Sequence, residues 1–431
     1  MGKNDDQGVK HLPRNMVEVN GIPIFEDEYE VVEDLGFREA WFGFYEENPL
    51  KSVGIHEGHI IKLEIHGESD LYEIRLESLP FLRYLNLWSN MAPVVPSSIQ
   101  DLECLEEIRF NGCHCREFPP AFKFPPSLKV IDLSGNLFEF LPDFIGSNNR
   151  VENLHIGRMC LKEIPDWVPK CRNLKVFRCD YNDITGGLEI LENFTNLTKL
   201  LIGHNKITSL PSRRCFPRSI RELSLCELEI SEIPEWIGEL TELRYLDLEY
   251  CPITTLPKSI GKLENLRRID MQRCRLSSIP SDIGRCKELK EVWMDFNELV
   301  EIPSSFGLLT NLRVLAATHN RLTAIPEWIG TLVKLEELYL NDNKIRSIPP
   351  ELADCTALKH ITLCDNQITT LPPEMVRLPP NVWVELEGNP VFKYLVFIEE
   401  KFEVETITEL FSYYNKLYDA ARKESSSQDT Q

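Results

Sequence analysis

The side chains best suited to chemistry in this chain are its 13 cysteines and nine histidines. Cys113-His114-Cys115 places three possible metal ligands side by side, because zinc prefers thiolate and imidazole donors. In a small secreted protein, this many cysteines would indicate a disulfide framework. This chain has 431 residues, and residues 1–20 lack the apolar stretch of a signal peptide. We therefore expect reduced thiols and a cytoplasmic protein.

Motifs with catalytic spacing are absent from the sequence. We find no Gly-x-x-x-x-Gly-Lys loop, no Gly-x-Ser-x-Gly elbow and no His-Glu-x-x-His helix. In the register described next, His155, His204 and His319 face outward singly, which favours contact with solvent or a partner over a metal site. We expect no catalytic, cofactor-binding or metal-binding residues, and hence a protein that is not an enzyme.

A repeated phrase decides where these side chains lie. With Leu standing for any aliphatic residue, it reads Leu-x-x-Leu-x-Leu-x-x-Asn-x-Leu-x-x-Ile-Pro, and its clearest copies are Leu335–Pro349 and Leu358–Pro372. After the second copy it returns every 23 residues. Such a period predicts an α/β solenoid in which each repeat adds one strand to a parallel sheet. The Asn position is held in turn by Glu68, Asn90, Cys113, Asn136, Met159, Asn182, Asn205, Leu228, Cys251, Cys274, Asn297, Asn320, Asn343, Asn366 and Asn389.

The register assigns eight cysteines to the core. Three occupy the Asn position, namely Cys113, Cys251 and Cys274. Three more, Cys171, Cys286 and Cys355, lie twelve residues after that position, in a column that is usually leucine. The last two, Cys115 and Cys179, replace leucines of the phrase. A buried thiol behaves as a small hydrophobe. Both sulfurs of the Cys-His-Cys triplet should point inward, which argues against a metal site there.

Four segments follow from the repeat boundaries. Residues 1–57 form an acidic N-terminal cap region, with 13 acids against 5 bases. Residues 58–390 form a solenoid of about 15 repeats. Residues 391–424 form a C-terminal helical cap and 425–431 a disordered tail. Caps are expected because an end repeat would otherwise expose its core. We predict one or two helices within Glu26–Tyr45 and an amphipathic helix over Thr406–Lys423.

Two sequence features of the outer side each have two possible interpretations. Trp167, Trp236 and Trp328 share one column, which fits either packing between adjacent turns or a docking stripe; the shared register favours packing. Gly186-Gly187 replaces the Ile-Pro step of its copy, and this change indicates either altered curvature or a different outer turn.

The phrase resembles a known family. Copies such as Leu243-x-x-Leu246-x-Leu248 followed by Leu256-Pro-Lys-Ser-Ile-Gly261 are similar to the 23-residue leucine-rich repeats of intracellular Ras-group scaffolds. The match covers about residues 58–390. The resemblance implies a horseshoe fold and a protein-binding scaffold that is often linked to a small GTPase or a phosphatase.

Charge limits the classes of partner. The net charge of −21 lacks the basic footprint that nucleic acids and anionic membranes require. No run of 18 apolar residues could cross a bilayer. We therefore expect another protein as the partner, with no nucleic acid, membrane or cofactor.

The strand residues that alternate outward predict where that partner binds. On the later repeats they combine acids with aromatics, a composition typical of interface hot spots. We call these residues the acidic–aromatic patch and expect them to bind a basic region of another protein, although Trp293 and Tyr339 could instead pack on nearby strand residues. The patch comprises Tyr245, Asp247, Glu249, Tyr250, Asp270, Gln272, Trp293, Asp295, Phe296 and Tyr339.

Two other functions remain open at this stage. A regulatory or substrate adaptor, acting in trans on a small GTPase pathway or a ubiquitin ligase, would use the terminal helix as a docking element. A reader of small molecules or glycans would use concave aromatics such as Trp88 or Trp293, but such readers are mostly secreted.

Overall fold

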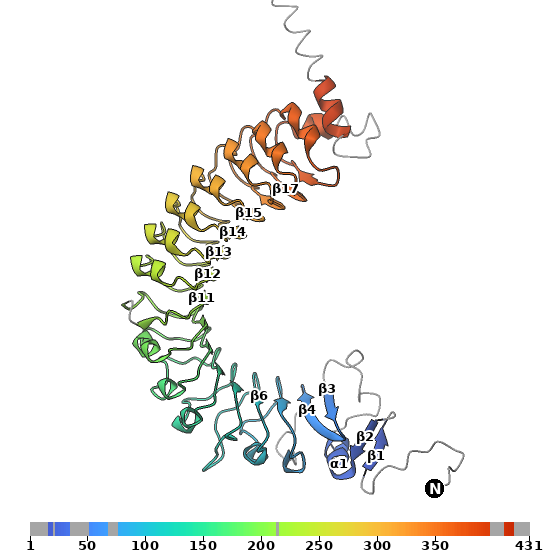
Figure 1. Ribbon diagram of the computed structural model, residues 1–431, viewed down its shortest axis with the longest axis vertical. Helices are drawn as coiled ribbons and strands as arrows, with labels where there is room; N and C mark the ends of the chain where they lie inside the picture. The colour runs from blue at the N-terminus through green and yellow to red at the C-terminus, as the bar shows by residue number, and fades with distance from the viewer. Residues whose placement is uncertain are drawn as a thin grey trace, which may run out of the picture. The chain divides into compact units, whose positions relative to one another are not determined.

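The computed structural model describes residues 16–19, 22–34, 51–67, 76–212, 215–396 and 409–417. The chain divides into two compact units, Met1–Leu197 and Thr198–Gln431. Figure 1 shows the elements of both units.

The first unit begins with elements that the sequence only partly predicted. β1 (Met16–Val19) and β2 (Ile22–Phe25) form an antiparallel hairpin, and α1 (Glu26–Asp34) follows directly. α1 lies where one or two helices were expected. Residues 35–45 of that predicted segment lie outside the described residues.

A second antiparallel pair starts the main sheet of this unit. β3 (Lys51–His56) pairs with β4 (His59–Ile65), so the sheet includes residues that were assigned to the cap region. Glu28 of α1 is buried and accepts a hydrogen bond of 2.6 Å from the backbone N–H of Ile60. Its other carboxylate oxygen lies 2.7 Å from Nδ1 of His59. The helix is thereby tied to the first repeat strand.

All later strands are parallel and three residues long. Each strand residue pairs with the residue 23 positions later on the next strand, as Leu223 does with Leu246. The α/β solenoid with a parallel sheet is confirmed, apart from the antiparallel β3. The first unit contributes β5 (Tyr84–Asn86), β6 (Glu107–Arg109), β7 (Val130–Asp132), β8 (Asn153–His155) and β9 (Val176–Arg178). The second unit contributes β10 (Lys199–Leu201), β11 (Glu222–Ser224), β12 (Tyr245–Asp247), β13 (Arg268–Asp270), β14 (Glu291–Trp293), β15 (Val314–Ala316), β16 (Glu337–Tyr339), β17 (His360–Thr362) and β18 (Trp383–Glu385).

Short 3-10 helices return the chain along the outer side, as the Ile-Pro step predicts. In the first unit these are Leu76–Ser78, Ser97–Asp101, Asp143–Ser147, Val168–Lys170 and Leu188–Asn193. In the second they are Glu235–Glu239, Lys258–Lys262, Ser281–Arg285, Ser304–Leu308, Glu327–Thr331, Pro350–Asp354 and Pro373–Arg377. Gly238 allows close stacking of these turns, because a Cβ there would lie 2.3 Å from the carbonyl oxygen of Ser259.

The Gly186-Gly187 step makes a different outer turn. Where most other outer helices are preceded by an extended proline such as Pro234, Gly187 adopts a left-handed conformation with φ of 81°. The helix that follows, Leu188–Asn193, spans six residues where five are common. The structure thus shows a different outer turn at these glycines.

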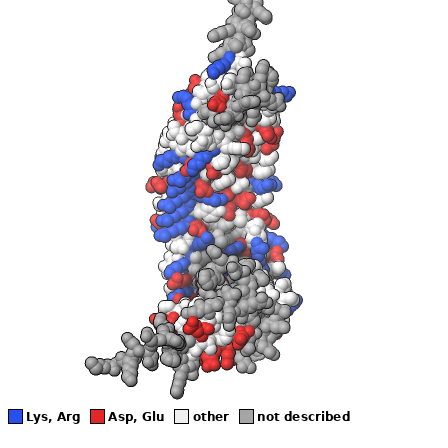
Figure 2. All heavy atoms as spheres, turned by 90° about the vertical axis from the view of Figure 1, so that its right-hand side faces the viewer, with Lys and Arg blue, Asp and Glu red and all other residues white. Residues whose placement is uncertain are grey.

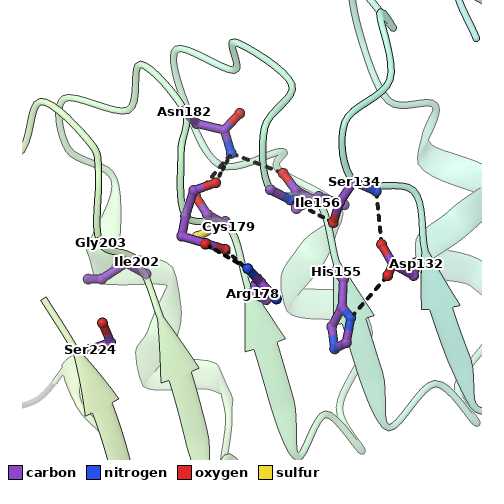
Figure 3. Close-up of polar contacts among 12 residues, drawn as sticks. Asp132, Ser134, His155, Ile156, Arg178, Cys179, Asn182, Ile202, Gly203 and Ser224 are labelled. Atoms are coloured by element: carbon purple, nitrogen blue, oxygen red, sulfur yellow. Dashed lines mark hydrogen bonds and ion pairs between the residues drawn. The ribbon is translucent and has the colours of Figure 1, made fainter. Parts of the chain in front are cut away.

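Buried asparagines join neighbouring turns. Asn182 donates from Nδ2 to the carbonyl oxygens of Ile156 and Cys179 at 2.9 and 3.0 Å (Figure 3). Its Oδ1 accepts from the backbone N–H groups of Met159 and Leu161. Four backbone groups that would otherwise be unpaired in the core are satisfied by one side chain.

We call the column of buried side chains at the Asn position the asparagine ladder. Where cysteine replaces asparagine in this column, its thiol donates a single hydrogen bond. Cys274 donates from Sγ to the carbonyl oxygen of Leu248 at 3.2 Å, and Cys251 makes the equivalent bond to Leu225 at 3.1 Å. All eight cysteines assigned to the core are buried, which confirms the register. Cys113 and Cys115 point inward onto the carbonyl oxygens of Leu87 and Ala92, and burial raises the pKa of both thiols.

The tryptophan column packs between turns, as its register favoured. Trp167 is buried and donates to the carbonyl oxygen of Leu141 at 2.9 Å. Trp236 packs on Phe216 and Trp328 on Phe306, with ring centroids 4.7 and 6.0 Å apart.

The described part of the expected terminal helix, residues 409–417, lies against the last turns of the second unit. Phe411 and Tyr414 are buried, and the Tyr414 hydroxyl accepts a hydrogen bond of 3.3 Å from the backbone N–H of Leu371. Asn415 donates to the carbonyl oxygen of Pro373 at 3.1 Å. The rest of the expected helix and the tail at 425–431 lie outside the described residues.

Candidate protein-binding surface

A column of left-handed residues borders the exposed face of the strands. The residue directly before each Asn position has a positive φ. For the non-glycine residues of this column, from Ser89 to Asp365, φ lies between 51° and 59°. Glycine, which adopts this conformation without strain, fills the same column at positions 67, 112, 135 and 388. Those four glycines are the sequence signal that could have revealed the turn. The other members are Arg158, Tyr181, His204, Glu227, Tyr250, Arg273, Phe296, His319 and Asp342.

The acidic–aromatic patch lies wholly within the second unit. Strand register places Asp247 beside Asp270 and Asp270 beside Trp293, on β12, β13 and β14. Tyr245 shares β12 with Asp247, while Glu249, Gln272 and Asp295 follow their strands two residues on. Tyr339 lies two strands further, on β16. Tyr250 and Phe296 belong to the left-handed column, where their side chains are 45% and 38% exposed.

The three aspartates accept hydrogen bonds from their neighbours. Asp247 accepts from the Ser224 hydroxyl at 2.7 Å and from the backbone N–H of Glu249 at 3.1 Å. Asp270 accepts from Nε2 of Gln272 at 3.2 Å. Asp295 accepts from the backbone N–H of Thr318 at 2.6 Å. These bonds hold the carboxylates in an oblique row, because Asp247 and Asp270 are neighbours in register while Asp295 lies two residues further along the chain than the next residue in that register, Trp293. Asp270 and Asp295 are buried, contrary to the outward position that the sequence predicted for them.

Burial and mutual repulsion raise the pKa of the acids in this row. Burial, followed by the charge of Asp270, raises the pKa of Asp295 to about 6. Burial also raises the pKa of Asp270, with a smaller contribution from Asp247. The pKa of Glu249 rises for the same reasons, because it is partly desolvated and lies near both aspartates. A cation placed over this row would favour the ionised carboxylates and so oppose the rise in their pKa.

Trp293 and Tyr339 form an aromatic pair beside the row. Their rings stack with centroids 6.2 Å apart and an interplanar angle of 23°. Trp293 Nε1 donates to Glu291 at 3.4 Å, and the Tyr339 hydroxyl donates to Glu337 at 2.9 Å. Both residues keep part of their surface exposed. The rings therefore pack on neighbours and also face solvent.

Arg268 lies within the patch, although the sequence did not predict it there. Its guanidinium lies 3.3 Å from both Asp270 and Glu291. It also lies over the rings of Tyr245 and Trp293, at 5.4 and 5.6 Å from their centroids. Arg268 pairs in register with Tyr245 and supplies the patch with an internal cation.

A stack of side chains continues along the left-handed column. The Arg273 guanidinium lies 5.2 Å from the Tyr250 ring and 4.0 Å from the Phe296 ring. His319 stacks on Phe296 at 4.2 Å and lies 3.3 Å from Asp342. These five residues, which we call the rim stack, hold the exposed aromatics in place at one edge of the patch.

The cations of the earlier strands are already paired. Arg178 makes two hydrogen bonds to Asp180 at 2.7 and 3.0 Å, and His155 lies 3.5 Å from Asp132 (Figure 3). Although burial opposes it, hydrogen bonds from His155 and Ser134 lower the pKa of Asp132. Arg109 likewise pairs with Glu107 at 2.7 Å. The first unit therefore offers little free positive charge on its strands.

Among the residues that the structure describes, no group of three or more His, Cys, Asp or Glu side chains is arranged to hold a metal ion. No helix in that part of the chain is long and apolar enough to span a membrane.

Family models match several stretches of the chain. A leucine-rich repeat region matches residues 237–323, paired leucine-rich repeats match 310–350 and 333–374, and a single leucine-rich repeat matches 127–148.

Curated relatives are similar over part of the chain. Protein SUPPRESSOR OF npr1-1, CONSTITUTIVE 1 of Arabidopsis thaliana is 28% identical over 39% of this chain and 13% of its own length. Plant intracellular Ras-group-related LRR protein 8 of Oryza sativa subsp. japonica is 29% identical over 27% of this chain and 32% of its own length. The chain thus spans less than a third of the length of each.

Solved structures share the fold. The Leptospira interrogans LRR protein LIC12759 aligns with a TM-score of 0.63 and 27% identity, over 76% of this chain and 78% of that one. The plant peptide hormone receptor RGFR1, solved in complex with RGF2, aligns with a TM-score of 0.57 and 24% identity, over 75% of this chain and 58% of that one.

Proposed function

Because this chain is a leucine-rich repeat protein, we propose that its acidic–aromatic patch captures a basic segment of a partner protein, and that the chain is a non-enzymatic scaffold. The observation that carries the proposal is the row of Asp247, Asp270 and Asp295, whose charges are held close together. A folded protein would not gain stability from such a row by itself, whereas a lysine or arginine from a partner would be attracted to it.

The aromatic residues give this site more than charge. Trp293 and Tyr339 supply apolar surface next to the carboxylates, and the rim stack holds Tyr250 and Phe296 at the edge. Aromatic anchors surrounded by charged groups are the usual composition of an energetic hot spot. Since these rings are already packed, less side-chain freedom is lost when a partner binds.

The chemistry of the patch selects a basic segment of a protein, whether that segment is extended or helical. The rice relative named as a Ras-group-related protein supports a role in small-GTPase signalling as the alternative, in which the chain is a regulatory adaptor in a cytoplasmic pathway. A ubiquitin-ligase adaptor would require the terminal helix to dock, yet Phe411 and Tyr414 of that helix are buried against the repeats.

The test uses the full chain and a fluorescein-labelled peptide of twelve residues rich in lysine and arginine. Asp247→Asn combined with Asp270→Asn should lower its affinity at least ~10-fold, because two of the charges that attract it are removed. The matched control is Glu232→Gln with Glu301→Gln, which removes the same charge from exposed positions outside the patch. Equal losses in both variants would show that the peptide responds only to overall charge, and the patch would be rejected.

A further inference from the structure

A second charged surface lies beside the strands of the second unit. The residue directly after the first leucine of each phrase is basic on five successive turns, namely Arg221, Arg244, Arg267, Lys290 and Arg313. We call these residues the basic ladder. Figure 2 shows a stripe of Lys and Arg side chains with Asp and Glu side chains beside it.

Backbone hydrogen bonds fix the spacing of the ladder. The N–H of Arg244 donates to the carbonyl oxygen of Arg221, and that of Arg267 to Arg244, both at 2.8 Å. The same bonds continue from Lys290 to Arg267 and from Arg313 to Lys290. Neighbouring members are therefore about 4.8 Å apart, the spacing of adjacent strands. The four arginines are exposed and the lysine is half-buried.

The same column is electrically balanced elsewhere in the chain. In the first unit Lys129 pairs with Glu106 at 2.6 Å and Lys175 with Glu152 at 2.7 Å, so that acids and bases alternate. At the end of the ladder Arg313 pairs with Glu336 at 3.4 Å. Alternation of this kind removes repulsion between adjacent turns.

Four members of the ladder lack that balance. Across the described ranges, Arg221, Arg244, Arg267 and Lys290 make no ion pair within 4.0 Å. Four like charges in a row destabilise the fold, and solubility does not call for them in a chain of net charge −21. Such a row is explained if a ligand of opposite charge covers it.

Further cations adjoin the ladder. An open hollow of about 730 Å³ is lined by the residues three positions before the first four members, namely Arg218, Thr241, Glu264 and Lys287. Lys262, Arg285 and Glu239 line it too, so the hollow has four cations against two acids. The ladder therefore borders a concavity with a surplus of positive charge.

We propose that the basic ladder binds a narrow acidic segment of a partner protein, a helix with glutamate or aspartate along one face. Residues three and four apart on a helix lie roughly 5–6 Å from each other, which is close to the spacing of the ladder. Arginine, four of the five members, binds carboxylates through two parallel hydrogen bonds.

Charges on either side of the ladder favour a narrow ligand. Glu222 and Glu291 lie on the strand side, and Glu242 and Glu288 lie on the other. A nucleic-acid duplex or an anionic membrane is wide enough to place its phosphates over these carboxylates, and the resulting repulsion would oppose binding. A single acidic helix needs to meet only one row of cations. The acidic–aromatic patch and the basic ladder thus differ in the charge of the segment that each selects.

The experiment measures binding of the full chain to a labelled helical peptide that carries glutamate at every third or fourth position. Arg244→Gln with Arg267→Gln should weaken binding at least ~10-fold, because two adjacent charge-assisted pairs are lost. The matched control is Lys129→Gln with Lys175→Gln, which removes equal charge from the same column of the first unit and should change affinity less than ~2-fold. Arg244→Lys with Arg267→Lys, which keeps the charge, should give an intermediate affinity.

Three results would overturn the assignment. The parent chain could fail to bind the acidic peptide, or the Arg244→Gln, Arg267→Gln variant could bind it as well as the parent does. Alternatively, a 20-base-pair DNA duplex or phosphatidylserine vesicles could bind more tightly than the peptide and lose affinity in that same variant, which would assign the ladder to nucleic acid or lipid. Circular dichroism of each variant ensures that a loss of binding is not a loss of folding.

Discussion

Trp293 and Tyr339 stack on one another across an intervening strand, with ring centroids 6.2 Å apart. Strand β15 separates them, and Ala316, which pairs in register with both residues, is fully buried. A larger side chain at this position would have to displace one of the rings. Ala316 is thus required for the site, because its small side chain allows the two rings to form a flat apolar surface in the absence of a partner.

The first prediction concerns this pair. Trp293→Ala should lower affinity for the lysine- and arginine-rich peptide by roughly 10- to 30-fold, since a buried aromatic anchor commonly contributes about 2 kcal/mol to binding. Trp383→Ala is the control, because Trp383 is 61% exposed on β18, away from the acidic row. Fluorescence anisotropy with both variants checks the result. If the Trp383 variant lost as much affinity, the aromatic pair would have no special role.

The second prediction follows from the pKa of Asp295, which rises from 3.8 to about 6 on folding. Between these pH values the folded chain binds more protons than the unfolded chain, so this group makes the fold less stable as the pH rises from about 4 to 6. Above pH 6 the ionised carboxylate costs at most about 3 kcal/mol.

Asp295→Asn removes this cost, and its side-chain oxygen can still accept the hydrogen bond from Thr318. Urea unfolding should therefore show a more stable variant at pH 7.5 and no gain at pH 4. The same variant should bind the basic peptide more weakly at pH 7.5, since a charge is lost from the row. A gain in stability that did not depend on pH would mean that the charge of Asp295 is not its cause.

The strict 23-residue period made most of the core and many of the outward strand residues predictable, because a single alignment of the repeats assigns each position of the phrase to the core or to the surface. The register alone places Cys274 in the Asn position, and the thiol is buried there as predicted. The left-handed column was missed because its members are chemically unrelated, as Tyr250 and Arg273 illustrate. A backbone angle set by the turn, and not a preference for one side chain, unites that column.

Side-chain pairing was the other feature that the sequence did not yield. Arg178 is bonded to Asp180, two residues further along the chain, and nothing in the repeat phrase indicates this pair. Arg268 was not predicted as part of the patch, yet it contacts Asp270 and Trp293. The β1–β2 hairpin was not predicted either, because it lies before the repeat begins and no period reports on it.

The third prediction tests the asparagine ladder at Asn320. This side chain donates to the carbonyl oxygens of Met294 and Ala317 at 2.9 and 3.1 Å and accepts from the N–H of Leu299 at 3.0 Å. Asn320→Leu leaves these buried groups unpaired, and we expect a loss of roughly 2–4 kcal/mol in the free energy of unfolding. Asn320→Cys should lose less, because a thiol can keep one donor bond, as Cys274 does. Equal losses from Leu and Cys would show that packing, and not hydrogen bonding, decides this position.

The fourth prediction separates a cap from a docking element. Phe411 is 1% exposed, whereas Leu417 on the same helix is 41% exposed. Phe411→Ala should cost about 3–5 kcal/mol of local stability, and Leu417→Ala should cost little. Because a solenoid is stabilised mainly by contacts between neighbouring repeats, the damage should be greatest where the helix packs.

Hydrogen exchange measured along the chain reads this out directly. In the Phe411→Ala variant, amides of β17 and β18 should exchange faster than those of β12 and β13, since the last repeats lose the side chain that covers them. A docking helix would behave differently: exchange in the repeats would match that of the parent chain. The buried hydroxyl contact between Tyr414 and Leu371 favours the first outcome, because it joins the helix to the last complete turn through the backbone itself.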